Sequence, residues 1–408
     1  MARDVSQNRL IDRLTAYLNH CNLPIQLNNG GICNGLATLY AKYVLEGRRA
    51  EFMSMLDYIS GKKSGGHEVD ASINEFVAQI ILSFDPAKYY HTLNQIRSYE
   101  IQRIDGEPLK SDFHLPLVTT QDNWAEIFEL IDLQENEVLI VQSLNHAISI
   151  TKKDNRYVVY DPNYERGEKS FSTSREMVRE LHKNCFEYKS NELGLTINLI
   201  THPQHAPRAT LPPAKGIYKQ YLKPDNVGIK VKTEDKEAST LELAACFNDT
   251  GLIEHLLQLD KNETNIYNAA VLAASDNNPD VLKQLLPRLS EEKIADSLVT
   301  ILFTIFKHGR QEAFNAFLQV PEAKLSYDLL KNNNNIPHVL IRSAARGGNA
   351  ALLQQVIGDY KDQNLDNPLT DHDIVSHIFK EKINNRGHKK GKTLGKNKPP
   401  YDDKAKAS

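Results

Sequence analysis

Residues 144–164, which read LNHAISITKKDNRYVVYDPNY, decide the fold of the N-terminal half of the chain. Two β-branched runs flank a short turn-forming segment, which predicts an antiparallel hairpin of residues 145–151 and 156–161. In a hairpin the start of the first strand lies opposite the end of the second, so the topology brings His146 next to Asp161. A carboxylate in that place can hold the imidazole in one tautomer while the other ring nitrogen faces a thiol.

A second motif, GGICNGLA at residues 30–37, lies where an irregular segment meets a segment with helical periodicity. We therefore expect Cys33 near a helix N-terminus, where unpaired N–H groups and the helix dipole lower the pKa of a thiol. The same donors can bind an oxyanion, and Gly30 and Gly31 permit close approach of a substrate. Taken alone, the motif would more often mean a small apolar residue at a helix start.

The order of elements in residues 1–201 predicts an α+β domain. Helical periodicity is followed by short strand-like runs. The expected helices are 36–44, 51–59, 73–82, 124–131 and 175–182, and the expected strands are 138–142, 147–150, 157–160 and 195–200. Helices first and an antiparallel sheet afterwards differ from the alternating order of a parallel sheet.

The ordered set of a helix-start cysteine, a strand-borne histidine and an aspartate resembles the papain-like cysteine proteases. The motifs GGICNGL, HAI and DPN resemble in particular the YopT-related proteases that bacterial pathogens deliver into host cells. The resemblance implies a papain-like domain over residues 1–201. It assigns Cys33 as nucleophile, His146 as general base and then acid, and Asp161 as the orienting carboxylate.

The same resemblance implies two auxiliary residues. A glutamine shortly before the cysteine would line the oxyanion site, and Gln26 is the candidate. Asn28 or Asn29 could serve instead, and an ordinary loop glutamine is the alternative. Asn163 is the second candidate for the orienting role. YopT-like sequences have a tryptophan after the nucleophile motif, whereas here Tyr40 stands in that stretch and is expected to take the packing role.

Beyond a proline-rich linker or arm at residues 202–237, the pattern becomes helical and repetitive. Four segments each contain a pair of small or apolar residues, a polar turn and a second apolar helix. The pairs begin at residues 244, 273, 305 and 344. TLELAA at residues 240–245 resembles the ankyrin repeat, so we expect about four ankyrin-like repeats over 238–380, forming an all-α solenoid. A generic helical bundle is the alternative.

The longest interval between these pairs predicts an inserted loop near residues 320–336. Insertions in solenoids map to loops that often lie on the binding face. We therefore expect a partner-binding loop that includes Asn332, Asn333, Asn334 and Asn335. Residues 381–408 are basic and lack periodicity, so we expect a disordered tail, with a nuclear-localisation or nucleic-acid-binding patch as the alternative.

Composition excludes several other classes of function. A net charge of −3 gives no global reason to expect nucleic acid as partner, and no apolar run is long enough to span a membrane. The N-terminal residues lack the apolar region of a signal peptide. The cysteines, among them Cys21, Cys185 and Cys246, have no paired spacing, which favours a reduced compartment. His202 and His205 with Cys185 lack metal-ligand spacing, so we expect no metal and no cofactor.

As a whole, the chain resembles the ankyrin-containing effectors of intracellular bacteria such as Legionella. That resemblance implies type IV secretion without a classical signal peptide, and action in the host cytosol or nucleus. It also implies a host protein recruited through the repeats. We expect the chain to be a monomer. Three functions follow: a cysteine protease, a deamidase or transamidase with the same three residues, or a binding scaffold with an inactive protease-like domain.

Overall fold

The computed structural model describes residues 4–20, 27, 32–61, 71–84, 97–206, 208–233, 236–289, 294–331 and 336–363. Its N-terminal half begins with four helices: α1 (Gln7–His20), α2 (Cys33–Leu45), α3 (Arg49–Gly61) and α4 (Ala71–Phe84). A small two-stranded sheet follows, formed by β1 (Arg103–Ile104) and β2 (Glu107–Pro108). The main sheet and two further helices complete this half.

The main sheet has six strands in the order β3-β8-β4-β5-β6-β7, and every neighbouring pair is antiparallel. The strands are β3 (Lys110–Thr120), β4 (Glu137–Gln142), β5 (Ala147–Lys153), β6 (Arg156–Tyr160), β7 (Glu168–Phe171) and β8 (Glu192–Thr201). Helices α5 (Gln121–Ile131) and α6 (Ser174–Glu180) lie between strands in the sequence. The α+β prediction is confirmed.

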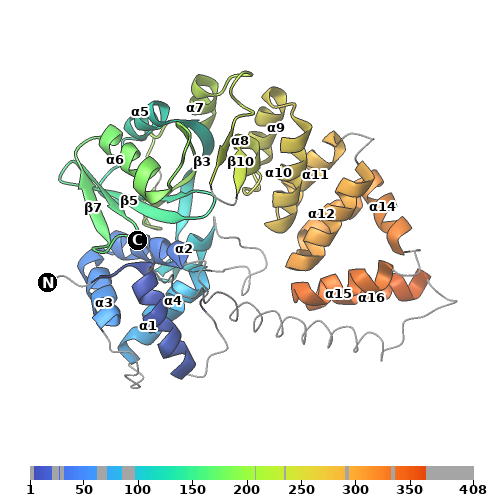
Figure 1. The fold of residues 1–408 in the computed structure, drawn as a ribbon, viewed down its shortest axis with the longest axis horizontal. Helices are drawn as coiled ribbons and strands as arrows, with labels where there is room; N and C mark the ends of the chain where they lie inside the picture. The colour runs from blue at the N-terminus through green and yellow to red at the C-terminus, as the bar shows by residue number, and fades with distance from the viewer. Residues whose placement is uncertain are drawn as a thin grey trace, which may run out of the picture.

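Helices cover both faces of the sheet (Figure 1). Along β4 the side chains alternate. Val138 and Ile140 pack in one core cluster with Ala41 of α2, whereas Leu139 and Val141 pack in another with α5 and α6. This alternation is the period of a strand buried on both sides. The N-terminal helices thus lie on the face from which Cys33 reaches the sheet.

The predicted hairpin is present as β5 and β6. Ser149 pairs with Tyr160 and Lys153 with Arg156, so only two residues form the turn. Asp154 and Asn155 occupy it with φ values of 50° and 59°. Positive φ at both central residues is the requirement of the type I′ turn, which matches the twist of the flanking strands and which Asn and Asp tolerate well.

Strand β3 is absent from the strands predicted from the sequence, and it contains Pro116. Proline cannot donate to a strand ladder, so it is confined to edge positions. Here β3 is an edge strand of the sheet. Helix α7 (Ala214–Tyr221), in the segment predicted as a linker or arm, packs on it, and the Tyr218 hydroxyl donates to the Pro116 carbonyl at 2.9 Å.

The C-terminal part of the described chain is helical. After the short strands β9 (Lys230–Lys232) and β10 (Glu237–Ser239) come α8 (Thr240–Ala244), α9 (Thr250–Leu259), α10 (Glu263–Ser275), α11 (Pro279–Leu285), α12 (Ile294–His308), α13 (Gln311–Gln319), α14 (Pro321–Lys331), α15 (Ile336–Gly347) and α16 (Ala350–Gln363). The small or apolar pairs found in the sequence lie near the ends of α8, α10, α12 and α15. The helical character is as predicted, and the ankyrin interpretation stays a prediction.

Polar turn residues join successive pairs of helices, which are α8–α9, α10–α11 and α12–α13. The side-chain oxygen of Asn248 accepts from the backbone N–H of Asp280 at 3.1 Å, and that of Asn277 accepts from Ala313 at 3.0 Å. Close backbone approach joins α12 to α15, because a Cβ at Gly347 would overlap the carbonyl oxygen of Phe306. These contacts stack each pair on the next, as in proteins built from repeated helical units.

The insertion expected as a loop near residues 320–336 is largely helical, which corrects that prediction. Helix α14 begins at Pro321, where proline is favoured because its missing N–H has no intrahelical partner to lose. Its buried Tyr327 packs edge-to-face on Phe306 and Phe314 of the third helix pair. Asn332, Asn333, Asn334 and Asn335 lie outside the described residues, as does the basic tail 381–408.

Within the described residues, no helix is long and apolar enough to cross a membrane. The same part of the chain contains no group of three His, Cys, Asp or Glu side chains that could hold a metal ion.

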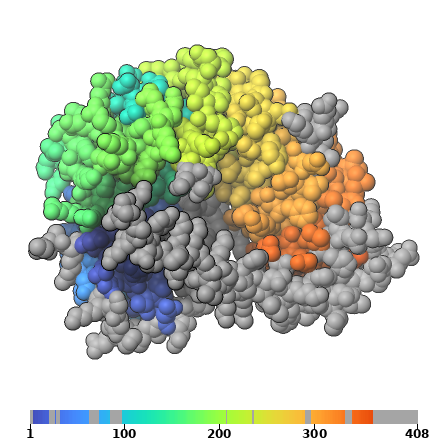
Figure 2. Space-filling view, viewed as in Figure 1, coloured from blue at the N-terminus to red at the C-terminus, as the bar shows by residue number. Residues whose placement is uncertain are grey.

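The two halves of the protein share one apolar core. Leu195 of β8, Val231 of β9, Leu243 of α8 and Ile305 of α12 belong to the same cluster of buried residues. Thr240 Oγ1 accepts a hydrogen bond of 3.0 Å from the backbone of Val118 in β3. The space-filling view shows a continuous surface from the green sheet segments into the yellow helices (Figure 2).

Candidate active site

The candidate nucleophile is the first residue of α2. Cys33 follows the N-cap residue Ile32, whose side chain does not cap the helix. Cys33 is buried against Ala37 and Ala147. Helix α2 can approach α4 closely because Gly35 has no side chain, and a Cβ there would overlap the backbone oxygen of Ile80. The thiol thus lies at a helix N-terminus that is pressed against the sheet, as the sequence predicted.

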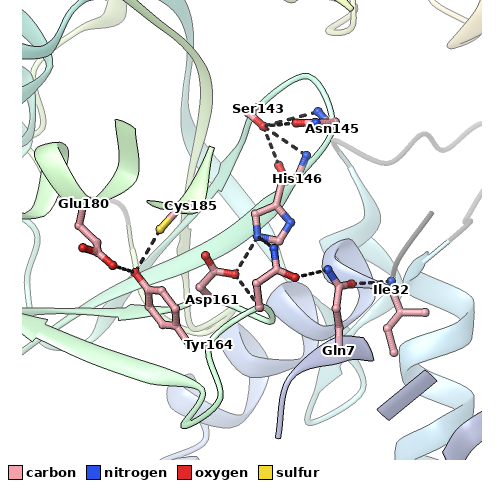
Figure 3. Close-up of polar contacts among 10 residues, drawn as sticks. Gln7, Ile32, Ser143, Asn145, His146, Asp161, Tyr164, Glu180 and Cys185 are labelled. Carbon is pink, nitrogen blue, oxygen red and sulfur yellow. Dashed lines mark hydrogen bonds and ion pairs between the residues drawn. The ribbon is translucent and has the colours of Figure 1, made fainter. Parts of the chain in front are cut away.

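His146 and Asp161 lie together at the end of the β5–β6 hairpin (Figure 3). His146 Nε2 lies 2.8 Å from Asp161 Oδ1, and both side chains are buried. A turn fixes the histidine, since the backbone N–H of Ser143 donates to the His146 carbonyl at 2.8 Å. The pairing predicted from topology is confirmed. Since Nε2 contacts the carboxylate, Nδ1 is the ring nitrogen left to face the thiol.

The electrostatics couple Cys33 to His146. Burial raises the pKa of the Cys33 thiol, but the hydrogen bond and charge of His146 and backbone hydrogen bonds at Ala147 and Asn34 outweigh it. The thiol pKa is therefore below its ordinary value of 9.0. Burial lowers the pKa of His146, whereas hydrogen bonds to Asp161 and Cys33 raise it to about 10. Both shifts favour a thiolate–imidazolium pair at neutral pH.

The other described cysteines behave in the opposite way. Burial and the nearby Asp161 raise the pKa of the Cys185 thiol, although Tyr164 partly offsets them with a hydrogen bond at 3.2 Å. Burial and Asp276 likewise raise the pKa of Cys246 well above its ordinary value. Of the three cysteines in the described part of the chain, Cys33 alone is held in an environment that favours the reactive thiolate.

Asn163 lies beside the pair rather than in place of Asp161. Its Nδ2 is 3.4 Å from His146 Nε2, and its backbone N–H donates to Asp161 Oδ1 at 2.7 Å. The shorter contact of the imidazole is the one to the carboxylate. Asp161 is therefore the better placed of the two orienting candidates, and Asn163 supports it. Gln26, the candidate oxyanion glutamine, lies outside the described residues, as do Asn28 and Asn29.

Two side chains that the sequence analysis did not single out also belong to this site. Gln7 of α1 accepts a hydrogen bond from Ile32 and donates one to Asn163. Asn34 of α2 accepts one from Gln142 of β4 at 2.7 Å. Neither has a signal in the sequence, because each contact joins elements far apart in the chain.

Aromatic rings join the helix that carries Cys33 to the strand that precedes Asp161. Tyr40 of α2 stacks on Tyr160, the residue before Asp161, with ring centroids 4.4 Å apart and planes 7° apart. Its hydroxyl donates to Glu168 at 2.7 Å. Tyr40 therefore fills the packing role expected for it, since it joins the nucleophile helix to the strand that carries the orienting carboxylate.

One comparison with known proteins bears on this domain. Residues 6–204 match the Peptidase_C58 family, described as Yersinia/Haemophilus virulence surface antigen. No curated protein matches the chain. The matched region contains the six-stranded sheet, helices α1–α6 and the Cys33, His146 and Asp161 cluster. The N-terminal half is therefore similar to this family of YopT-like cysteine proteases, and the match ends before the helical region.

Proposed function

We propose that the domain over residues 1–201 is a cysteine hydrolase that cleaves a protein substrate by acyl transfer. The observation that carries this proposal is the His146–Asp161 contact of 2.8 Å beside a thiol whose pKa His146 lowers. A preformed thiolate–imidazolium pair is the reactive state of such enzymes. The match to a peptidase family supports the same conclusion.

The proposed reaction uses the three residues in sequence. Cys33 Sγ attacks the substrate carbonyl, and the oxyanion forms near the backbone N–H groups at the start of α2. His146 then donates its Nδ1 proton to the leaving amine as the C–N bond breaks and a thioester forms. Water attacks the thioester while His146 accepts a proton from the water, which releases the acid and restores the Cys33 thiolate and the His146 imidazolium. Asp161 keeps the imidazole oriented throughout.

Deamidation and transamidation begin with the same thioester chemistry, with ammonia as the leaving group, so they are variants of this proposal. They differ in the group released and, for transamidation, in the acceptor. A mass change on an intact substrate chain would identify them, whereas cleavage gives two fragments. The scaffold alternative predicts neither product.

We further propose that the chain is a translocated effector and that its helical region recruits a host protein. Helix α14 supports recruitment, because Leu325 and Leu329 are 61% and 64% exposed and lie one turn apart. Adjacent exposed apolar side chains are typical of surfaces that bind other proteins. Replacing both leucines by aspartate should weaken capture of the substrate while Cys33 stays reactive.

A thiol-reactive probe tests the hydrolase proposal. At neutral pH, iodoacetamide should label Cys33 much faster than Cys185 and Cys246, and His146→Ala should abolish that preference. His114→Ala is a matched control, since His114 pairs with Asp249 at 3.1 Å, away from the hairpin end. Equal labelling of all three cysteines in the wild type would favour the scaffold. The Cys33→Ala variant, used as a trap, should retain the substrate for identification.

A further inference from the structure

Gln7 joins the two parts of the candidate active site that come from distant segments. It is the first residue of α1 and is buried. Its Oε1 accepts a hydrogen bond of 2.9 Å from the backbone N–H of Ile32, the residue before Cys33. Its Nε2 donates to Asn163 Oδ1 at 2.5 Å, on the loop that follows Asp161. One side chain thus connects the nucleophile segment to the histidine–aspartate pair.

The backbone N–H of Ile32 fixes the direction of every hydrogen bond in this chain of contacts. A backbone N–H can only donate, so the Gln7 atom that faces it must be the carbonyl oxygen. The Gln7 amide nitrogen must then face Asn163, whose atom there must be the acceptor oxygen. Asn163 consequently turns its NH2 group towards His146 Nε2, 3.4 Å away.

This orientation decides which group receives the imidazole proton. A donor NH2 cannot accept the proton on Nε2, whereas Asp161 Oδ1 can, at 2.8 Å. Were the Asn163 amide free to turn, its oxygen would compete with Asp161 for that proton. The backbone reinforces the arrangement, because the N–H of Gln7 donates to the Pro162 carbonyl at 2.6 Å.

We propose that Gln7 is a positioning residue for the reaction. Through Asn163 it directs the Nε2 proton of His146 to Asp161, and through Ile32 it fixes the start of the nucleophile helix. The inference rests on the proposed hydrolase function. It adds a residue outside the three that carry the chemistry, at the start of α1.

Two substitutions separate this role from a purely structural one. Gln7→Met keeps the length of the side chain but removes both hydrogen bonds, so the Asn163 amide can turn. Gln7→Glu keeps the shape. An ionised carboxylate can accept from Ile32 but cannot donate to Asn163, whereas the protonated acid can do both, as glutamine does. Lowering the pH should therefore restore the labelling rate of Cys33 in Gln7→Glu and should not restore it in Gln7→Met.

The matched control is Gln102→Met. Gln102 is also a buried glutamine, and its amide donates to Ser83 Oγ at 2.7 Å, so its loss should have a comparable effect on packing. The rate of iodoacetamide labelling at Cys33 and the thermal unfolding midpoint are measured for the full-length wild type and all three variants. Cys33 should be labelled about tenfold more slowly in Gln7→Met than in Gln102→Met, while the two variants have similar thermal unfolding midpoints. A lost buried hydrogen bond is worth about that factor.

The dependence of the Cys33 labelling rate on pH distinguishes a positioning role of Gln7 from a purely structural one. The ratio of the Gln7→Glu rate to the wild-type rate should rise as pH falls through the pKa of the introduced carboxyl, which burial raises above its usual value of about 4.3. The ratio for Gln7→Met should not rise as pH falls, because methionine has no group to protonate. A Gln7→Glu ratio that does not change with pH, or equal rates in Gln7→Met and Gln102→Met, would overturn the proposal.

A second measurement is independent of thiol reactivity. The Nε2 proton resonance of His146, assigned with His146→Ala, reports the hydrogen bond to Asp161 directly. It should shift in Gln7→Met and stay in place in Gln102→Met. An unreactive Cys33 in the wild type together with this shift would refute the hydrolase and still show that Gln7 directs the Nε2 proton of His146 to Asp161. An unchanged resonance refutes the positioning role whatever the thiol does.

Discussion

The dependence of Cys33 reactivity on His146 can be worked out from the structure. Burial raises the pKa of the Cys33 thiol, and the two effects that chiefly oppose it both come from His146. In His146→Ala both are lost. The thiol pKa should then rise to 9.0 or above, since only burial and the weaker backbone hydrogen bonds remain.

This change should appear in the slope of the labelling rate with pH. A thiol with a pKa of 9.0 is about 1% ionised at pH 7 and about 50% ionised at pH 9, so its labelling rate should rise about 50-fold over that interval. In the wild type the thiol pKa is lower, so the rise should be much smaller. The slope is a better measure than the rate at a single pH. The intrinsic nucleophilicity of the thiolate also changes with the thiol pKa, but it is constant for a given variant.

The assay measures iodoacetamide labelling of Cys33 by peptide mass spectrometry at several pH values, with Cys185 as an internal standard. The wild type and His114→Ala should give the shallow profile, and His146→Ala the steep one. The same steep profile in all three proteins would show that His146 does not hold the thiol as an anion.

Two further predictions concern stability. Asp161→Asn removes the carboxylate that helps to raise the pKa of His146 to about 10 from its ordinary 6.5. A histidine pKa that is raised in the folded state stabilises the fold fully below pH 6.5, and this stabilisation is lost as pH rises through about 10. The loss in free energy of unfolding should therefore be largest at about pH 6.5 and shrink towards pH 10, as urea denaturation would show, and a constant difference would contradict it. Gly347→Ala should destabilise by about 3 kcal/mol, because its Cβ would overlap the Phe306 carbonyl. Gly358→Ala in α16, whose Cβ would meet no atom within 4 Å beyond its own stretch of helix, should instead stabilise by about 0.5 kcal/mol, and equal effects would contradict the close approach.

The hairpin was predictable because its determinants are local. The sequence itself provides β-branched runs, and Asp154 and Asn155 tolerate the positive φ of the turn. Once the hairpin is given, topology alone places His146 near Asp161. Cys33 could be placed at a helix start for the same reason, because helical periodicity begins there.

The features that were missed depend on contacts between distant segments. Strand β3 is stable as an edge strand despite Pro116, and only the strand order reveals that it is an edge. Gln7 has no local signal, because its partners Ile32 and Asn163 lie far away in sequence. The helix in place of the expected inserted loop depends on Tyr327, which packs between aromatic rings of other helices.

The shared core has a consequence for how the protein can be divided. At Gly194 in β8 a Cβ would overlap Val231 of β9, so the sheet is in van der Waals contact with residues beyond the boundary at 201. A fragment ending there would expose apolar surface and should aggregate, whereas one extended past α9 would keep it covered. Trp124, the single tryptophan of the sequence, lies in this core, so its fluorescence would monitor unfolding of the sheet and the first helix pairs as one cooperative event.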